Sequence, residues 1–210
     1  MNELRCIHRH SIKTHPNCFK RGLIHYNWWE NKRIAYLDIE TSDLKADFGI
    51  VLTWCLKFQK DKNIYSAIIT KEDIEDRTFD KRIIKSLLEA LENVDIVVTY
   101  YGTDFDIPFL RTRAEKWRLD FPKYGYIAHW DLYYKVKKLF KTHRKSLGVV
   151  TNFLGISGKT FIDGDIWFVA QYGDEKALKY ILEHNKQDVI ILEKLHERIK
   201  EYSKWERRSL

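Results

Sequence analysis

Short apolar runs and longer segments with helical spacing alternate along the chain. Four of the runs are rich in β-branched and aromatic residues, which is typical of buried strands. The polar Gln59–Lys62 predicts a hairpin turn between the second and third runs, and residues 80–93 carry apolar side chains at helical spacing. Three strands, a helix and a strand in this order predict an α/β domain. The predicted strands are residues 33–41, 50–58, 63–70 and 95–101.

Helical spacing dominates the second half of the chain. A helix is predicted from Asp106 to about Arg118, with Pro108 in its first turn, where proline is tolerated. Asp131 follows an apolar-aromatic run and is predicted to cap a further helix. The remaining predicted helices are 146–155, 165–172 and a long one over 174–203 with one apolar side.

Composition places the chain among globular proteins. Its 210 residues fit one domain with a small appendage, and 44% of them are hydrophobic. No run approaches the roughly 18 apolar residues of a membrane span. The polar N-terminus lacks the apolar core of a signal peptide, so we expect a cytoplasmic protein. Three cysteines, an odd number, argue against a disulfide framework.

The formal net charge of +7 favours a polyanionic partner. Two basic stretches, one after Asp106 and one after Asp131, are interleaved with aromatic residues, which suits a groove that follows a phosphate backbone. The alternative is an ordinary solvated face. The residues expected to contact nucleic acid are Arg111, Arg113, Lys137, Lys138, Lys141, Arg144 and Lys145.

The first predicted strand ends in two acids, Asp38 and Glu40. Alternate residues of a strand point to the same face, so both carboxylates should project side by side. Two such charges repel unless a cation lies between them, and a hard divalent ion such as Mg²⁺ or Mn²⁺ is the usual partner. Two solvated acids at a strand end are the alternative.

Three further residues extend this candidate site. Asp106 brings a third carboxylate to a strand end, although it can equally serve as a helix cap. His184 and Asp188 are four residues apart and share one face of the long helix, where they can supply a base and a metal ligand. Asp131, besides capping a helix, has a second interpretation, in which it supports the site from outside the set of metal ligands.

Residues 1–30 differ from the rest and are treated as a separate extension before a domain over 31–210. They place two cysteines and three histidines in the pattern C-x-H-x-H-x₄-H-x₂-C. Thiolates and imidazoles at this density can close a structural zinc site in a segment too short and polar to fold alone. A basic, His-rich arm that touches nucleic acid or covers the domain is the alternative. The expected ligands are Cys6, Cys18, His15 and either His8 or His10.

Taken together, Leu37–Thr41, Phe105–Pro108 and His184–Asp188 resemble the three motifs of the DEDD superfamily, to which proofreading exonucleases belong. The chain also resembles the predicted RNase H-like nucleases of prokaryotic and viral genomes, over roughly residues 33–200. The resemblance implies an RNase H-like fold, in which a mixed central sheet is flanked by helices. It also implies two bound Mg²⁺ or Mn²⁺ ions, held by Asp38, Glu40, Asp106 and Asp188.

In this resemblance one ion lies among Asp38, Glu40 and Asp188, while the other is held chiefly by Asp38, with Asp106 acting through water. Two departures are visible. One branch of the superfamily has tyrosine four residues before the last aspartate, and the other has histidine five residues before it. This chain has His184 at the four-residue spacing, so it matches neither branch. In the second motif, Tyr101 replaces the usual asparagine.

The expected activity is a 3′→5′ exonuclease that hydrolyses single-stranded DNA or RNA by a two-metal-ion mechanism, with His184 as the residue that orients or deprotonates the attacking water. A structure-specific endonuclease on the same fold and a non-catalytic nucleic-acid-binding module are the alternatives.

Overall fold

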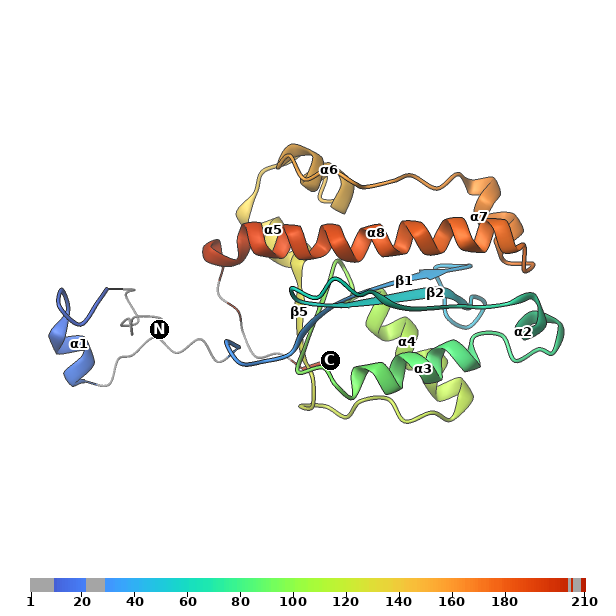
Figure 1. Cartoon of the computed structure of the whole chain (residues 1–210), viewed down its shortest axis with the longest axis horizontal. Helices are drawn as coiled ribbons and strands as arrows, with labels where there is room; N and C mark the ends of the chain where they lie inside the picture. Colours follow the sequence, from blue (N-terminus) through green and yellow to red (C-terminus); the bar gives the residue numbers. More distant parts are fainter. Residues whose placement is uncertain (1–9, 22–28, 204, 206–208) are drawn as a thin grey trace. The chain divides into compact units, whose positions relative to one another are not determined.

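The computed structural model describes residues 10–21, 29–203, 205, 209 and 210 of the chain. These belong to two compact units, Met1–Lys32 and Arg33–Leu210. The first unit contains one short helix, α1 (Pro16–Lys20), which has no buried residue. The second unit contains the sheet and all the longer helices (Figure 1).

A five-stranded mixed sheet forms the centre of the second unit, in the order β3-β2-β1-β4-β5. β1 pairs antiparallel with β2 and parallel with β4, so the strand that carries Asp38 and Glu40 is central. This confirms the predicted α/β fold with a mixed sheet. The strands are β1 (Ile34–Thr41), β2 (Val51–Phe58), β3 (Tyr65–Ile68), β4 (Ile96–Thr99) and β5 (Ala128–Asp131).

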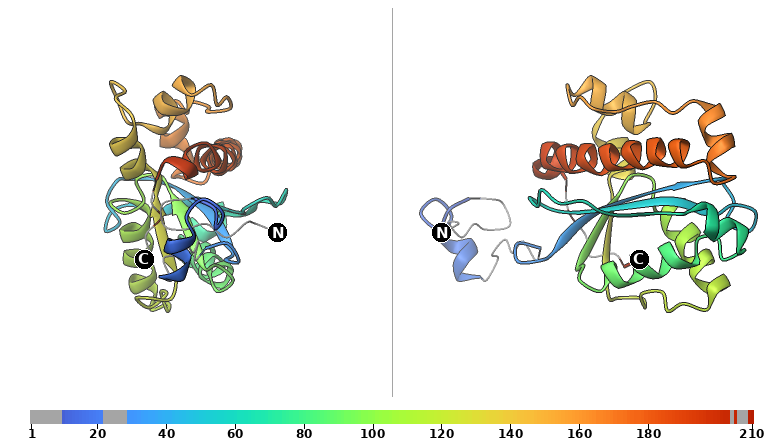
Figure 2. Two further views of the ribbon diagram at one scale, coloured as in Figure 1. Left: turned by 90° about the vertical axis from the view of Figure 1, so that its left-hand side faces the viewer. Right: turned by 45° about the vertical axis from the view of Figure 1, so that its right-hand side comes forward.

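Helices cover both faces of the sheet. Figures 1 and 2 show α3 and α4 on one side and α5 to α8 on the other. Within the described part of the chain, no helix has the length and hydropathy needed to cross a membrane. The helices are α2 (Lys71–Glu75), α3 (Lys81–Leu91), α4 (Asp106–Trp117), α5 (Leu132–Leu139), α6 (Leu147–Phe153), α7 (Gly164–Ala170) and α8 (Glu175–Ile199), followed by a 3₁₀ turn (Lys200–Tyr202).

The alternation of side chains along β1 separates the core from the candidate site. Ala35, Leu37 and Ile39 are buried and belong to the main apolar core. The even-numbered residues face the other way, since the Tyr36 hydroxyl lies 2.8 Å from His196 Nδ1 on α8. Asp38 therefore projects from the face of the sheet that α8 covers.

One predicted nucleic-acid contact is wrong, because Arg113 lies in the core with a side chain only 1% exposed. Its guanidinium donates to both carboxylate oxygens of Asp80, at 2.7 and 2.8 Å. The reason is helical phase: Arg113 shares the buried face of α4 with Leu110 and Ala114. A charged residue on that face must be paired, and Asp80, at the N-terminus of α3, supplies the partner.

Candidate active site

The carboxylates of β1 lie opposite two polar residues of α8. The His184 Nε2 atom is 3.6 Å from Glu40 Oε1 and 3.7 Å from Asp188 Oδ2. The side-chain amide of Asn185 donates to the main-chain oxygen of Asp38 at 3.3 Å and ties the helix to the strand. The candidate ligand atoms of Glu40, His184 and Asp188 all lie within 4.8 Å of one another.

A tight turn between β4 and α4 delivers the third carboxylate. Tyr101 adopts a left-handed backbone with φ 68°, and a side chain at Gly102 would collide with Thr99, 2.3 Å away. The turn starts α4 at Asp106, which is buried, and the Asp106 carboxylate accepts a hydrogen bond from the backbone N–H of Ile39 at 3.3 Å. Asp106 therefore lies beside the residue between Asp38 and Glu40. Asp104, an acid in the turn two residues before Asp106, instead accepts a hydrogen bond from the Tyr134 hydroxyl.

Asp131 holds this turn in place. Its carboxylate accepts hydrogen bonds from the backbone N–H groups of Tyr101 at 2.8 Å and Thr103 at 2.9 Å. It also accepts one from Tyr133 N–H at 3.0 Å, which confirms the predicted cap of α5. A single side chain thus fixes both the α5 terminus and the turn that positions Asp106.

Burial and mutual repulsion make these carboxylates reluctant to ionise together. Burial raises the pKa of Glu40 to about 8, and the neighbouring Asp188 contributes in the same direction. Burial also raises the pKa of Asp106 to about 7, and it raises the pKa of Asp38 well above its usual range, reinforced by the charges of Glu40 and Asp188. A cation among these groups would relieve the repulsion.

The sequence analysis missed Lys159, which lies between α6 and α7. Its ammonium forms an ion pair with Asp188 and lies 3.2 Å from His184 Nε2. The adjacent Thr160 hydroxyl is hydrogen-bonded to His184 Nδ1. No periodicity marks this segment, and its only local signal is the pair of turn-forming residues Gly155 and Gly158, both with positive φ.

A cavity of about 350 Å³ opens onto the cluster. Acidic residues of β1 and α8 line it together with residues that follow Gly158, so its wall comes from three separate parts of the chain. The lining residues are Asp38, Ile39, Glu40, Lys159, Thr160, Phe161, Ile162, Trp167, His184 and Asp188.

The donor set fits hard divalent cations. Carboxylate oxygens are the ligands that Mg²⁺ and Mn²⁺ prefer. Asp188 Oδ1 is buried and has no hydrogen-bond partner among the described residues, which is costly for a carboxylate oxygen unless it coordinates an ion. The residues thus suit a metal centre at the end of β1.

The predicted nucleic-acid contacts other than Arg113 do not line one groove. Arg111 lies on α4, on the opposite side of the sheet from α5, with its guanidinium 5.2 Å from the Phe121 ring centre. The Lys145 ammonium donates to the main-chain oxygen of Thr142 at 2.6 Å, while Arg144 is exposed.

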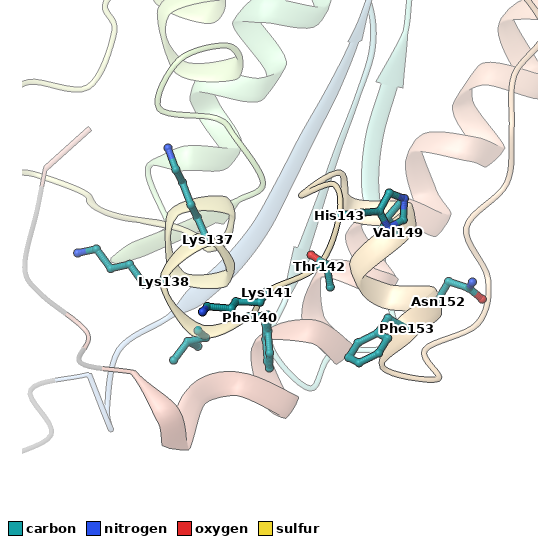
Figure 3. A pocket seen from close by; sticks show the side chains of 10 residues that line it. Lys137, Lys138, Phe140, Lys141, Thr142, His143, Val149, Asn152 and Phe153 are labelled. Atoms are coloured by element: carbon teal, nitrogen blue, oxygen red, sulfur yellow. The ribbon is translucent and has the colours of Figure 1, made fainter.

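Lys137, Lys138 and Lys141 line a second cavity of about 1010 Å³, here called the α5–α6 cavity. Figure 3 shows these lysines together with Phe140 and Phe153, which come from the two sides of the cavity. Phe153 is 71% exposed, which is unusual for a phenylalanine side chain. The α5–α6 cavity therefore combines aromatic surface with positive charge.

Three of the five predicted zinc ligands fall within the described residues, and two of these, His10 and Cys18, each approach the third, His15. The Nδ1 atoms of His10 and His15 are 3.1 Å apart, and Cys18 Sγ is 3.7 Å from His15 Nδ1. The other two, Cys6 and His8, lie outside the described residues.

Known proteins match this chain as a family profile, as a sequence relative and as solved structures. The RNase_H superfamily profile matches residues 35–200. A DNA polymerase of Methanocaldococcus jannaschii is 32% identical in an alignment of 120 positions that covers 46% of this chain and 7% of the polymerase. The structure of the family B DNA polymerase of the hyperthermophilic archaeon Pyrobaculum calidifontis superimposes with a TM-score of 0.69 at 20% identity, over 84% of this chain and 26% of that one. The chain thus spans a small part of each polymerase.

Proposed function

Since the chain belongs to the RNase_H superfamily, we propose that it is a metal-dependent 3′→5′ exonuclease that hydrolyses phosphodiester bonds of single-stranded DNA or RNA. One observation carries the proposal. Residues far apart in the sequence meet here, because Glu40 at the end of β1 and His184 and Asp188 in α8 place candidate ligand atoms within 4.8 Å of one another. One buried oxygen of Asp188 lacks a hydrogen-bond partner among the described residues. Such a cluster is costly without a cation and suits phosphodiester hydrolysis with one.

Two Mg²⁺ or Mn²⁺ ions fit this donor set. Asp38, Glu40 and Asp188 would hold one ion, and Asp38 together with Asp106 would hold the other. When bound, the ions supply a nucleophilic water at neutral pH and stabilise charge on the leaving oxygen. The protein contributes fixed ligand positions, because Asn185 ties α8 to β1 and Asp131 holds the turn before Asp106.

His184 is the residue proposed to orient or deprotonate the water. The Thr160 hydroxyl engages its Nδ1 atom, which leaves Nε2 facing Glu40 and Asp188. Burial and the Lys159 charge both lower the pKa of His184, so its ring is neutral and able to accept a proton.

Lys159 is proposed to contact the phosphate being cleaved. Its ammonium lines the same cavity as the acids and now pairs with Asp188. With Asp188 engaged by a metal ion, the ammonium would be available to a phosphate group in the same cavity. Its charge would then stabilise the negative charge that develops in the transition state.

The α5–α6 cavity supports the choice of a single strand. Lysines attract phosphates, and exposed aromatic rings offer stacking surface to bases that are free of a partner strand. Paired bases cannot reach Phe153 or Phe140 without leaving the duplex.

Digestion of 5′-labelled single-stranded DNA and RNA tests this function. Mn²⁺ should produce a ladder of products that shortens with time, and circular single strands should survive because they have no 3′ end. EDTA should abolish cleavage. Asp104→Asn provides a matched control. Asp104 is only two residues from Asp106, but its carboxylate lies outside the cluster and is hydrogen-bonded to Tyr134. Cleavage of the circle would favour the endonuclease alternative, and strand binding without cleavage in any metal would favour the binding module.

A further inference from the structure

The N-terminal unit holds two contacts between metal-binding side chains within nine residues, and both contacts involve His15. His10 Nδ1 and His15 Nδ1 are 3.1 Å apart, their ring centres are 3.9 Å apart, and Cys18 Sγ approaches His15 Nδ1 at 3.7 Å. Around a tetrahedral zinc ion, bond lengths of about 2.05 Å to nitrogen and 2.3 Å to sulfur place two nitrogens roughly 3.3 Å apart and nitrogen and sulfur roughly 3.6 Å apart. The His10–His15 and His15–Cys18 distances are therefore close to two edges of such a tetrahedron. The three donors do not all lie within 4.8 Å of one another, so a zinc ion would have to draw His10 and Cys18 closer.

The local chain geometry explains why these side chains meet. His15 precedes α1 as its N-cap residue, and Cys18 lies in the first turn, three residues later. Pro16 starts the helix, where its fixed backbone angle is well suited. The backbone N–H of His15 also donates to the Ser11 oxygen at 3.0 Å, which closes the chain between His10 and His15. The turn and the helix start thus bring His10 and Cys18 each next to His15.

Apolar packing contributes little to this arrangement. α1 has five residues, none of them buried, and its N-cap residue forms no side-chain capping hydrogen bond. A helix this short is unstable on its own in water. Short segments of this kind usually acquire their fold from a metal ion or a disulfide.

We propose that the unit Met1–Lys32 binds one structural zinc ion through His10, His15 and Cys18. The sequence offers Cys6 and His8, outside the described residues, as candidates for the fourth position. The donor chemistry separates this site from the active site, because thiolate and imidazole select zinc whereas carboxylates favour Mg²⁺ or Mn²⁺. The competing interpretation is a hydrogen bond between two imidazoles with a nearby thiol.

Zinc analysis of the full chain, purified without chelators, tests the proposal. We expect about one zinc per chain, and a fall of at least about fivefold in His15→Ala and Cys18→Ser. His143→Ala and Cys55→Ala are matched controls outside the unit and should retain the zinc, as should the active-site variant Asp38→Asn. A protein without zinc, or zinc retained in both His15→Ala and Cys18→Ser, would overturn the site.

Cobalt substitution keeps the test valid if a variant folds poorly. The parent chain loaded with Co²⁺ should show the visible bands of tetrahedral cobalt and a thiolate-to-cobalt charge-transfer band, which Cys18→Ser should weaken. An octahedral spectrum without charge transfer would also overturn the proposal. Neither measurement uses nuclease activity, so the zinc site and the proposed function succeed or fail separately.

Discussion

The polar cluster at the end of β1 and the α5–α6 cavity differ in how they use charge. In the cluster, Asp106, His184 and Asp188 are each less than 9% exposed, and hydrogen bonds from Ile39 N–H and Thr160 hold two of them. In the α5–α6 cavity, Lys137, Lys138 and Lys141 stand on an open surface around aromatic rings. Desolvated, fixed charges interact strongly, whereas exposed charges are screened. Chemistry is therefore expected at the first region and strand binding at the second.

The largest expected effect comes from the metal ligands. Asp188→Asn removes a charged ligand while keeping its shape, and turnover should fall by at least about 10³-fold, since the ion proposed to lie among Asp38, Glu40 and Asp188 loses one of its three carboxylates. The fold should survive, because removing one of several repelling carboxylates relieves strain in the metal-free protein. Kinetics in Mn²⁺ together with a melting curve measure both effects. Near-normal turnover would remove Asp188 from the metal centre.

Replacing the proposed base should have the next largest effect. His184→Ala is expected to lower turnover by roughly 10²–10⁴-fold, the usual contribution of general acid–base catalysis. Mn²⁺ affinity, measured by titration, should change little, and His184→Tyr should recover part of the loss. A matching loss of Mn²⁺ affinity would instead make His184 a ligand. Unchanged turnover would restrict it to packing against Asp188.

Lys159 separates turnover from metal binding. Lys159→Ala should lower turnover by about 10–10²-fold through the loss of charge stabilisation, with partial rescue by Lys159→Arg. Mn²⁺ should bind more tightly in Lys159→Ala, because the ammonium no longer competes for Asp188. The exposed Lys176 on α8 offers Lys176→Ala as a control. Weaker Mn²⁺ binding in the Lys159 variant would contradict the competition.

The α5–α6 cavity should affect binding rather than turnover. Replacing Lys137, Lys138 and Lys141 by alanine should weaken the binding of single strands and reduce the dependence of log K on log salt by about 2, at roughly 0.7 for each phosphate that is no longer neutralised. Turnover at saturating substrate should be nearly unchanged. The exposed Lys62, Lys81 and Lys123, replaced together, match the change in charge. An equal salt effect in this control would point to net charge alone.

The smallest expected effect is a change in the stability of the metal-free protein with pH. In the metal-free protein the folded state holds protons on Glu40 and Asp106, whose pKa values of about 8 and 7 exceed those of an unfolded chain. The folded state therefore binds more protons than the unfolded state between about pH 5 and 8, so stability should fall as pH rises through this window. Melting temperatures should fall by a few degrees from pH 5.5 to 8.5. Both added Mn²⁺ and the substitution Glu40→Gln should make this fall in melting temperature smaller. A melting temperature that rises with pH would contradict the raised pKa values of these carboxylates.

Local geometry explains why the sequence could place the proposed acids on common faces. Asp38 and Glu40 share a face through the two-residue period of a strand, and His184 and Asp188 share one through the turn of a helix. Asp106 follows from the strand–turn–helix pattern, although only the structure shows the Asp131 hydrogen bonds that hold the turn.

Contacts between distant segments were beyond such reasoning. Lys159 meets Asp188 across 29 residues of sequence, and nothing periodic in its segment indicates that contact. The number of basic residues in this segment suggests a basic surface, but the position of Arg113 around the helix places its side chain on the buried face of α4. Helix α2 was missed because five residues are too few for a period, although Thr70 and Asp73 form a capping box there.

Turnover of a 5′-labelled single strand, measured while metal-free protein is titrated with Mn²⁺, tests the central claim most directly. The parent chain and Asp38→Asn should be followed in parallel, because Asp38 is the ligand proposed to be shared by both ions. The account predicts no cleavage in EDTA, stepwise shortening from the 3′ end as Mn²⁺ is added to the parent, and no cleavage by the variant at any Mn²⁺ concentration. Cleavage that survives EDTA, or an Asp38→Asn protein that cleaves as fast as the parent, would contradict it.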